Sequence, residues 1–175
     1  MEPDLKTKIN SLIAMLDCKE PIQCRRARRQ LIKIGQPAVS ALIAAAAVGP
    51  MMQRWEAMRA LGSIGRDEAI KALIVHLADA EPGIRWAAAD SLVKIGERAT
   101  MPVLRAVIAN GKSMPFRDGA HHFLIDVATG SDPRIGMLEP VIKSMEEPGA
   151  DLAAPVAAEV ALEKIREFNK VGKGI

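Results

Sequence analysis

The residues with the clearest capacity for chemistry are a histidine and two acids near residue 120. His122 and Asp126 are four residues apart, and Asp118 lies four residues before His122, so on a helix the three side chains would follow one face. Imidazole and carboxylate groups at such a spacing are ligands for divalent metals. No His or Cys stands at an equivalent place elsewhere, and His76 belongs to a different segment. We therefore expect a polar helix face and no bound metal.

A second group with binding potential is a basic run without one acid between Pro21 and Pro37. Its cations are Arg25, Arg26, Arg28, Arg29 and Lys33. Several guanidinium groups on one helix create a positive field that attracts phosphates or acidic side chains. Arg28 falls on a different side of such a helix from Arg25 and Arg29, and no nucleic-acid recognition motif is present. An acidic protein partner or plain solvation is therefore favoured over nucleic acid.

The sequence lacks the usual signals of an enzyme. It has no Gly-rich phosphate loop, and no serine has a neighbouring histidine, so no nucleophile with its base is recognised. Cys18 and Cys24 have no metal-ligand spacing and no further His or Cys nearby. We interpret them as free thiols in a reducing cytosol. We predict no catalytic residue and no cofactor.

These side chains belong to a segment that is repeated about every thirty residues. Residues 54–65 and 85–96 share the pattern Arg-Trp-x-Ala-x-x-x-Leu-x-x-Ile-Gly, residues 24–35 keep its Ala, Leu, Ile and Gly, and residues 117–128 are a weaker copy. A fixed period between 20 and 50 residues is typical of stacked repeat arrays.

Each copy reads as the second helix of a helical pair. Its Ala, Leu and Ile recur at i, i+4 and i+7, which places them on one stripe that must be buried, and its final Gly ends the helix. A single pair cannot cover its own apolar face. The sequence therefore predicts an all-α fold, a right-handed α-α superhelix (solenoid) of about five antiparallel helix pairs. We expect one domain over residues 1–175, with units near 5–35, 37–65, 67–96, 99–128 and 134–168.

Two tryptophans occupy equivalent positions in consecutive copies. Trp55 and Trp86 should therefore lie side by side on the stack. Exposed rings would form an aromatic ledge beside Arg25, Arg59 and Lys94, a composition typical of binding hot spots. Alternatively, each ring packs over the Arg of the next unit and seals the seam between repeats. The repeated Arg at 54, 85 and 117 is interpreted as structural, reaching back to the acids of the preceding turn or to carbonyls of the preceding helix.

The order of a Pro turn, Ile-Arg, an Ala run, Leu, Ile and Gly over residues 82–96 resembles the short HEAT-like repeats, including those named after phycobilisome lyases. The resemblance covers nearly the whole chain and is strongest over residues 24–109. It implies a helical solenoid, which in this family serves mostly as a scaffold for protein binding, although a fold does not establish an activity. Helical-repeat hydroxylases of the superfamily bind iron through His-Glu pairs, and this chain has no His-Glu dipeptide.

In such repeats the concave surface is lined by positions of the second helix that lie outside the buried stripe. Transferred to this chain, the resemblance implies a partner-binding face made of Arg25, Arg26, Arg29, Lys33, Trp55, Glu56, Arg59, Trp86, Asp90, Lys94, Asp118, His122 and Asp126.

We therefore expect a non-catalytic, cytoplasmic scaffold or adaptor that binds an unidentified protein or peptide on this face. One alternative is a bilin-lyase-like or small-ligand-binding accessory protein that uses the two tryptophans; another is a nucleic-acid-associated protein that uses the basic helix. Self-association through the first or last helix is a weaker alternative. The N-terminus lacks the layout of a signal peptide, and no apolar run is long enough to cross a bilayer, so we expect no membrane contact.

Overall fold

The amphipathic segments form ten α-helices within the residues that the structure, a computed structural model, describes, namely 3–130 and 133–171. The first helices of the pairs are α1 (Pro3–Ala14), α3 (Val39–Val48), α5 (Asp67–His76), α7 (Glu97–Asn110) and α9 (Ile135–Glu146). The second helices are α2 (Pro21–Ile34), α4 (Met51–Ile64), α6 (Pro82–Ile95), α8 (Met114–Ala128) and α10 (Ala150–Val171). A short 3-10 helix, η1 (Gln36–Ala38), leads into α3.

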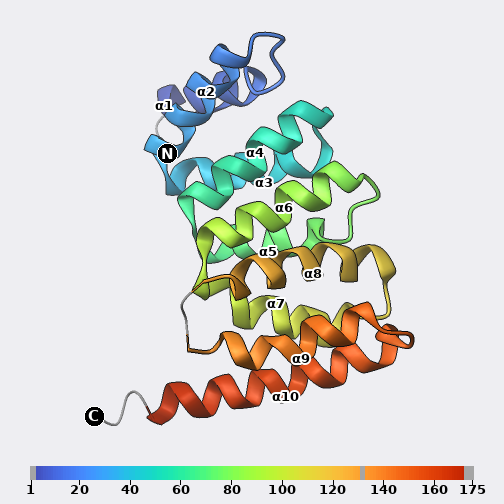
Figure 1. The fold of residues 1–175 in the computed structure, drawn as a ribbon. Helices are drawn as coiled ribbons and strands as arrows, with labels where there is room; N and C mark the ends of the chain where they lie inside the picture. Colours follow the sequence, from blue (N-terminus) through green and yellow to red (C-terminus); the bar gives the residue numbers. More distant parts are fainter. Residues whose placement is uncertain (1–2, 131–132, 172–175) are drawn as a thin grey trace.

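The helices stack in sequence order, so that the first pair and the last pair lie at opposite ends of the molecule (Figure 1). The second helices α2, α4, α6 and α8 follow one another along one face, and α3, α5 and α7 lie behind them (Figure 1). Helix α4 packs against both α2 and α6, and α6 packs against α8. The predicted all-α solenoid is confirmed.

The repeated Ala and Leu positions form the core of the stack. Both residues of the motif are fully buried in each of the four copies, at Ala27, Leu31, Ala57, Leu61, Ala88, Leu92, Ala120 and Leu124. The Ile that follows, at 34, 64 and 95, is only partly buried. The apolar stripe is therefore fully buried at its Ala and Leu and, in α2, α4 and α6, partly exposed to solvent at its C-terminal Ile.

The repeated glycines end their helices as the pattern predicts. Gly35, Gly65 and Gly96 have positive φ angles of 71°, 64° and 76°, a region that glycine enters without steric cost. Each N–H donates to the carbonyl of the Leu four residues earlier. Helix α8 has Ala128 in place of this glycine and ends without a left-handed residue.

Arginines near the start of the second helices donate hydrogen bonds to backbone carbonyls at the end of the preceding first helix or in the turn that follows it. Arg54 Nε donates to the carbonyl of Ala46 at 2.9 Å, and Arg85 Nη1 donates to that of Asp79 at 2.8 Å. Arg117 repeats the contact, from Nη1 to the carbonyl of Gly111 at 2.6 Å. Ala46 belongs to the last turn of α3, whose carbonyls have no partner within the helix, and Asp79 and Gly111 lie in the turns after α5 and α7. The three arginines therefore give hydrogen-bond donors to backbone carbonyls that the helices do not use. The predicted structural role of the three arginines is confirmed.

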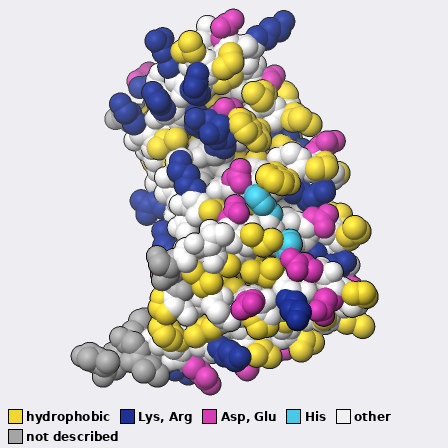
Figure 2. All heavy atoms as spheres, viewed as in Figure 1, with side chains coloured by type: hydrophobic (Ala, Val, Ile, Leu, Met, Phe, Trp, Pro, Cys, Tyr) yellow, Lys and Arg dark blue, Asp and Glu magenta, His cyan; other side chains and the backbone are white. Residues whose placement is uncertain are grey.

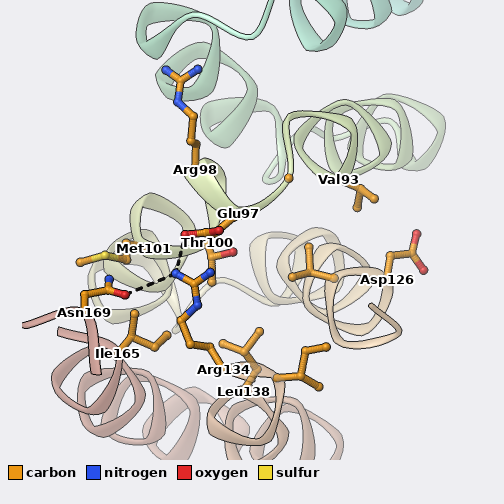
Figure 3. A pocket seen from close by; sticks show the side chains of 13 residues that line it. Val93, Glu97, Arg98, Thr100, Met101, Asp126, Arg134, Leu138, Ile165 and Asn169 are labelled. Carbon is orange, nitrogen blue, oxygen red and sulfur yellow. Dashed lines mark hydrogen bonds and ion pairs between the residues drawn. The ribbon is translucent and has the colours of Figure 1, made fainter. Parts of the chain in front are cut away.

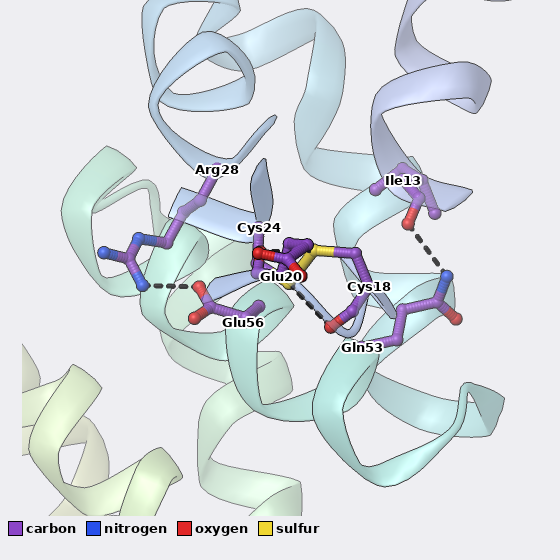
Figure 4. The surroundings of a disulfide bond; sticks show 7 residues. All are labelled: Ile13, Cys18, Glu20, Cys24, Arg28, Gln53 and Glu56. Carbon is purple, nitrogen blue, oxygen red and sulfur yellow. Dashed lines mark hydrogen bonds and ion pairs between the residues drawn. A yellow bond between two sulfur atoms is a disulfide. The ribbon is translucent and has the colours of Figure 1, made fainter. Parts of the chain in front are cut away.

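The first pair uses a disulfide at the same place (Figure 4). Cys18 and Cys24 are joined, with Cα atoms 5.8 Å apart, so the prediction of two free thiols was wrong. Cys24 occupies the repeat position of Arg54 and Arg85 and lies in the first turn of α2, where the helix start turns back toward the α1–α2 turn. The repeat alignment carried the missed signal, since this position faces the turn in every copy.

No single helix in the described ranges combines the length and the apolar character that a membrane span requires. Residues Pro21–Ile34 and Gln36–Val48 meet that criterion only as a pair, and they are bent by 117° with respect to each other.

Candidate functional site

The exposed face of α2 carries a cluster of cations that we call the basic patch: Arg25, Arg26, Arg29 and Lys33. All four are exposed, as predicted, and none makes an ion pair with any residue that the structure describes. Lys and Arg side chains gather at the end of the stack that holds α1 and α2 (Figure 2). The patch therefore presents positive charge that the described part of the fold does not neutralise.

Glu56 does not belong to the exposed face, which corrects its predicted role. Its side chain is only 3% exposed and pairs with Arg28 across the contact between α2 and α4 (Figure 4). The equivalent positions in α6 and α8, Ala87 and Gly119, are buried too. Two small residues at the same repeat position indicate a buried seam, and the sequence carried this signal.

The two tryptophans differ in their surroundings. Trp55 is partly buried against the core, and the guanidinium of Arg59 lies over its ring at 4.6 Å. Trp86 is 60% exposed and stacks on His122 of α8, with ring centroids 4.1 Å apart. The ledge hypothesis therefore describes Trp86, whereas Trp55 is covered by an Arg of its own helix and not by one of the next unit.

A shallow pocket of about 260 Å³ lies between α4 and α6. It is lined by Trp55, Arg59, Ala87, Asp90, Ser91 and Lys94. Lys94 Nζ donates to Ser63 Oγ at 2.8 Å across the same two helices. Four of the predicted site residues thus meet at one hollow, with an aromatic wall and charges of both signs.

Asp90 also meets two further predicted residues, His122 and Asp126, on the other side of α6 where it faces α8. His122 Nε2 lies 3.1 Å from Asp90 Oδ1 of α6 and 3.7 Å from Asp126 Oδ2 of α8. The three side chains offer ligand atoms that all lie within 4.8 Å of one another. Asp118 does not join them, because its carboxylate lies 3.7 Å from Arg85. The convergence thus crosses two helices, unlike the single-helix set of 118, 122 and 126 that the spacing suggested.

A polar network at the α5–α6 turn holds the third unit to the second. Asp79 pairs with Arg54, and His76 Nδ1 lies 3.3 Å from its Oδ2. Burial lowers the pKa of His76, and the nearby Arg54 lowers it further, against the opposing influence of Asp79. Burial alone would raise the pKa of Asp79, but hydrogen bonds from the Glu81 N–H, Arg54 and His76 outweigh it, so that this pKa is lowered.

A second pocket, of about 370 Å³, lies between α7, α8, α9 and α10 (Figure 3). The Arg134 guanidinium points into it and pairs with Glu97, and it lies 3.4 Å from the Asn169 amide oxygen. Most of the remaining lining is apolar, including Leu138 and Ile165. Arg134, Leu138 and Asn169 lie outside the four copies of the motif, so the repeat pattern did not indicate this pocket.

Comparisons with known proteins agree with this architecture. The family model for HEAT repeats matches residues 39–125, which run from α3 to α8. A chain from the complex of CpcE and CpcF of phycocyanin lyase from Nostoc sp. PCC7120 aligns with a TM-score of 0.55 and 20% identity, covering 89% of this chain and 98% of that one. At this identity the likeness is one of fold. The curated proteins give no match.

The chain is a HEAT-like repeat protein. Its fold, the repeat period and the family match lead independently to that class.

Proposed function

We propose that this protein is a non-catalytic scaffold that binds an acidic segment of a partner protein along α2, α4 and α6. The observation that carries the proposal is that the arginines of the second helices fall into two groups, one paired with acids and one not. Arg28, Arg54 and Arg85 pair with acids of this chain, whereas the basic patch has no acidic partner in the described residues. Unsatisfied charge on one face attracts a partner of opposite charge and speeds its encounter.

Trp86 adds an exposed apolar surface to the charged face, and a partner can bury this surface. Its exposed ring is held by His122, so little side-chain freedom is lost when a partner covers it. Tryptophan and arginine are the residue types most often found at the energetic centre of protein interfaces. A partner with acidic residues opposite α2 and an apolar residue opposite α6 would complement the face.

The reactive side chains have partners within the described residues. His76 contacts Asp79, His121 contacts Glu146, His122 contacts both Asp90 and Asp126, and both cysteines are in the disulfide. The likeness to a phycocyanin lyase chain concerns the fold, and a fold alone does not establish an activity.

The test is capture of the partner from the native extract, followed by measurement of its affinity for purified variants. Arg25→Glu/Arg29→Glu reverses two charges of the basic patch, and we expect binding to weaken about tenfold or more, since each exposed charge contributes up to about 1 kcal/mol. Trp86→Ala should weaken it by about 2 kcal/mol, near thirtyfold.

The matched control is Lys71→Glu/Arg105→Glu. Both residues are exposed on first helices, and the change in net charge is the same. Equal weakening by both double variants would show that binding depends only on net charge and would refute the assignment of this face.

A further inference from the structure

We propose that Asp90, His122 and Asp126 form a binding site for a divalent first-row transition metal ion, bridging α6 and α8. The site takes one imidazole nitrogen and two carboxylate oxygens, and it does not depend on the partner proposed above. It joins two repeats that also meet through the Arg85–Asp118 ion pair and the stacked rings of Trp86 and His122.

The separations fit the geometry of such an ion. Ligand bonds of about 2.0–2.2 Å place neighbouring ligand atoms about 3.0–3.5 Å apart in octahedral or tetrahedral arrangements. The His122 Nε2 atom lies 3.1 Å from Asp90 Oδ1, which is within this range, and 3.7 Å from Asp126 Oδ2, which is slightly above it. Asp90 is exposed and Asp126 is partly exposed, so both carboxylates can rotate slightly toward a common centre without moving a packed side chain.

Two carboxylates and one imidazole meet at this point. Among the basic side chains of α6, Arg85 lies near Asp118, and Lys94, which lines the same pocket as Asp90, donates to Ser63. The Asp126 carboxylate points away from Arg134 (Figure 3). Histidine and acidic side chains lie next to one another on the face that Figure 2 shows.

The donor set and its support narrow the class of ion. Mixed imidazole and carboxylate ligands suit Zn²⁺, Co²⁺ or Mn²⁺ better than Ca²⁺, which takes oxygen ligands alone. The stacked Trp86 ring orients the imidazole of His122, as supporting groups do in metal sites. Three protein ligands leave further positions open to water or to a donor from a bound molecule.

Trp86 also makes the proposal measurable, because an ion on His122 lies next to the indole and Co²⁺ quenches indole fluorescence at short range. The experiment titrates Co²⁺ into the full chain carrying Trp55→Phe, so that Trp86 is the only emitter. We expect saturable quenching that Zn²⁺ reverses. Asp90→Asn and Asp126→Asn, which leave the ring stack in place, should each weaken Co²⁺ binding about tenfold or more.

His121→Gln is the matched control, because His121 neighbours the site in sequence but contacts Glu146 at 3.0 Å instead. It should leave the Co²⁺ affinity unchanged. Circular dichroism melts establish that every variant is folded. The proposal is overturned if quenching does not saturate up to about 1 mM Co²⁺, or if both Asn variants bind as tightly as their parent.

Discussion

The spacing between α4 and α6 depends on one missing side chain, at Gly62. A Cβ atom added there would lie 2.8 Å from the Cα, Cβ and carbonyl oxygen of Ser91. Two of these are backbone atoms, so the clash can be relieved only if the helices separate. The same two helices carry the walls of the pocket between Trp55 and Lys94.

Gly62→Ala should therefore destabilise the protein although Ala favours helices. Overpacking costs about 3 kcal/mol where backbone must move, and the helix propensity of Ala returns about 1 kcal/mol. The net loss of about 2 kcal/mol corresponds to a fall in melting temperature of about 4–8 °C for a chain of this size. Thermal melts followed by circular dichroism measure it.

Gly83→Ala is the same substitution without the clash. Gly83 lies in the first turn of α6, where an added Cβ meets nothing within 4 Å, so the melting temperature should rise slightly, by about 1–2 °C. If Gly62→Ala were as stable as Gly83→Ala, the close approach of α4 and α6 would not set their spacing, and the description of the pocket would have to change.

Three further predictions concern the contacts that hold the units together. Arg54→Ala should cost about 2–3 kcal/mol in urea unfolding, because it removes the ion pair of the partly buried Asp79 and the donor to the Ala46 carbonyl. Arg25→Ala on the exposed face should stay within about 0.5 kcal/mol. The pKa of His76 is lowered in the folded protein, so as the pH falls the unfolded chain binds this proton before the folded chain does. The neutral imidazole therefore contributes its full stability above about pH 6.5, and this contribution is lost as the pH falls toward the folded pKa. Between pH 7.5 and 5 the melting temperature should fall less for His76→Gln than for the wild type, and an equal fall would contradict the prediction. The disulfide closes a short loop with a sequence separation of 6, so its reduction should lower the free energy of unfolding by about 2 kcal/mol. Hydrogen exchange should become faster in α1 and α2 but not in α6. Equal acceleration in all three helices would contradict a local effect of the disulfide.

The sequence predicted the fold well because its signals are repeated. The buried Ala and Leu, the helix-ending glycines and the fastening arginines each recur at one position of the motif, so that each copy supports the interpretation of the others. Each unit also packs mainly on its neighbours, which makes local pattern a good guide to contact.

The site was predicted less completely. Whether a side chain is exposed depends on its partner in a neighbouring repeat, and the thirty-residue repeat pattern does not specify such partners. The small residues Ala87 and Gly119 indicated a buried position, but the partner of Glu56, Arg28 of α2 in the preceding unit, was not specified by the period. Asp90 meets His122 only because α6 and α8 lie side by side, and a search along one helix paired His122 with Asp118 instead. In the first unit Cys24 stands at the position of the repeated Arg, and a disulfide to Cys18 takes the place of the hydrogen bond from Arg to the turn.

Photo-crosslinking of the bound partner tests the central claim most directly. A photoreactive amino acid with an aromatic ring, which keeps the apolar contact of the indole, is placed at Trp86 on the proposed face or at Val75 of α5, which is similarly exposed at 71%. The account predicts a strong crosslink to the partner from position 86 and none from position 75. A crosslink from position 75 with none from position 86 would place the binding surface on the first helices and contradict the account.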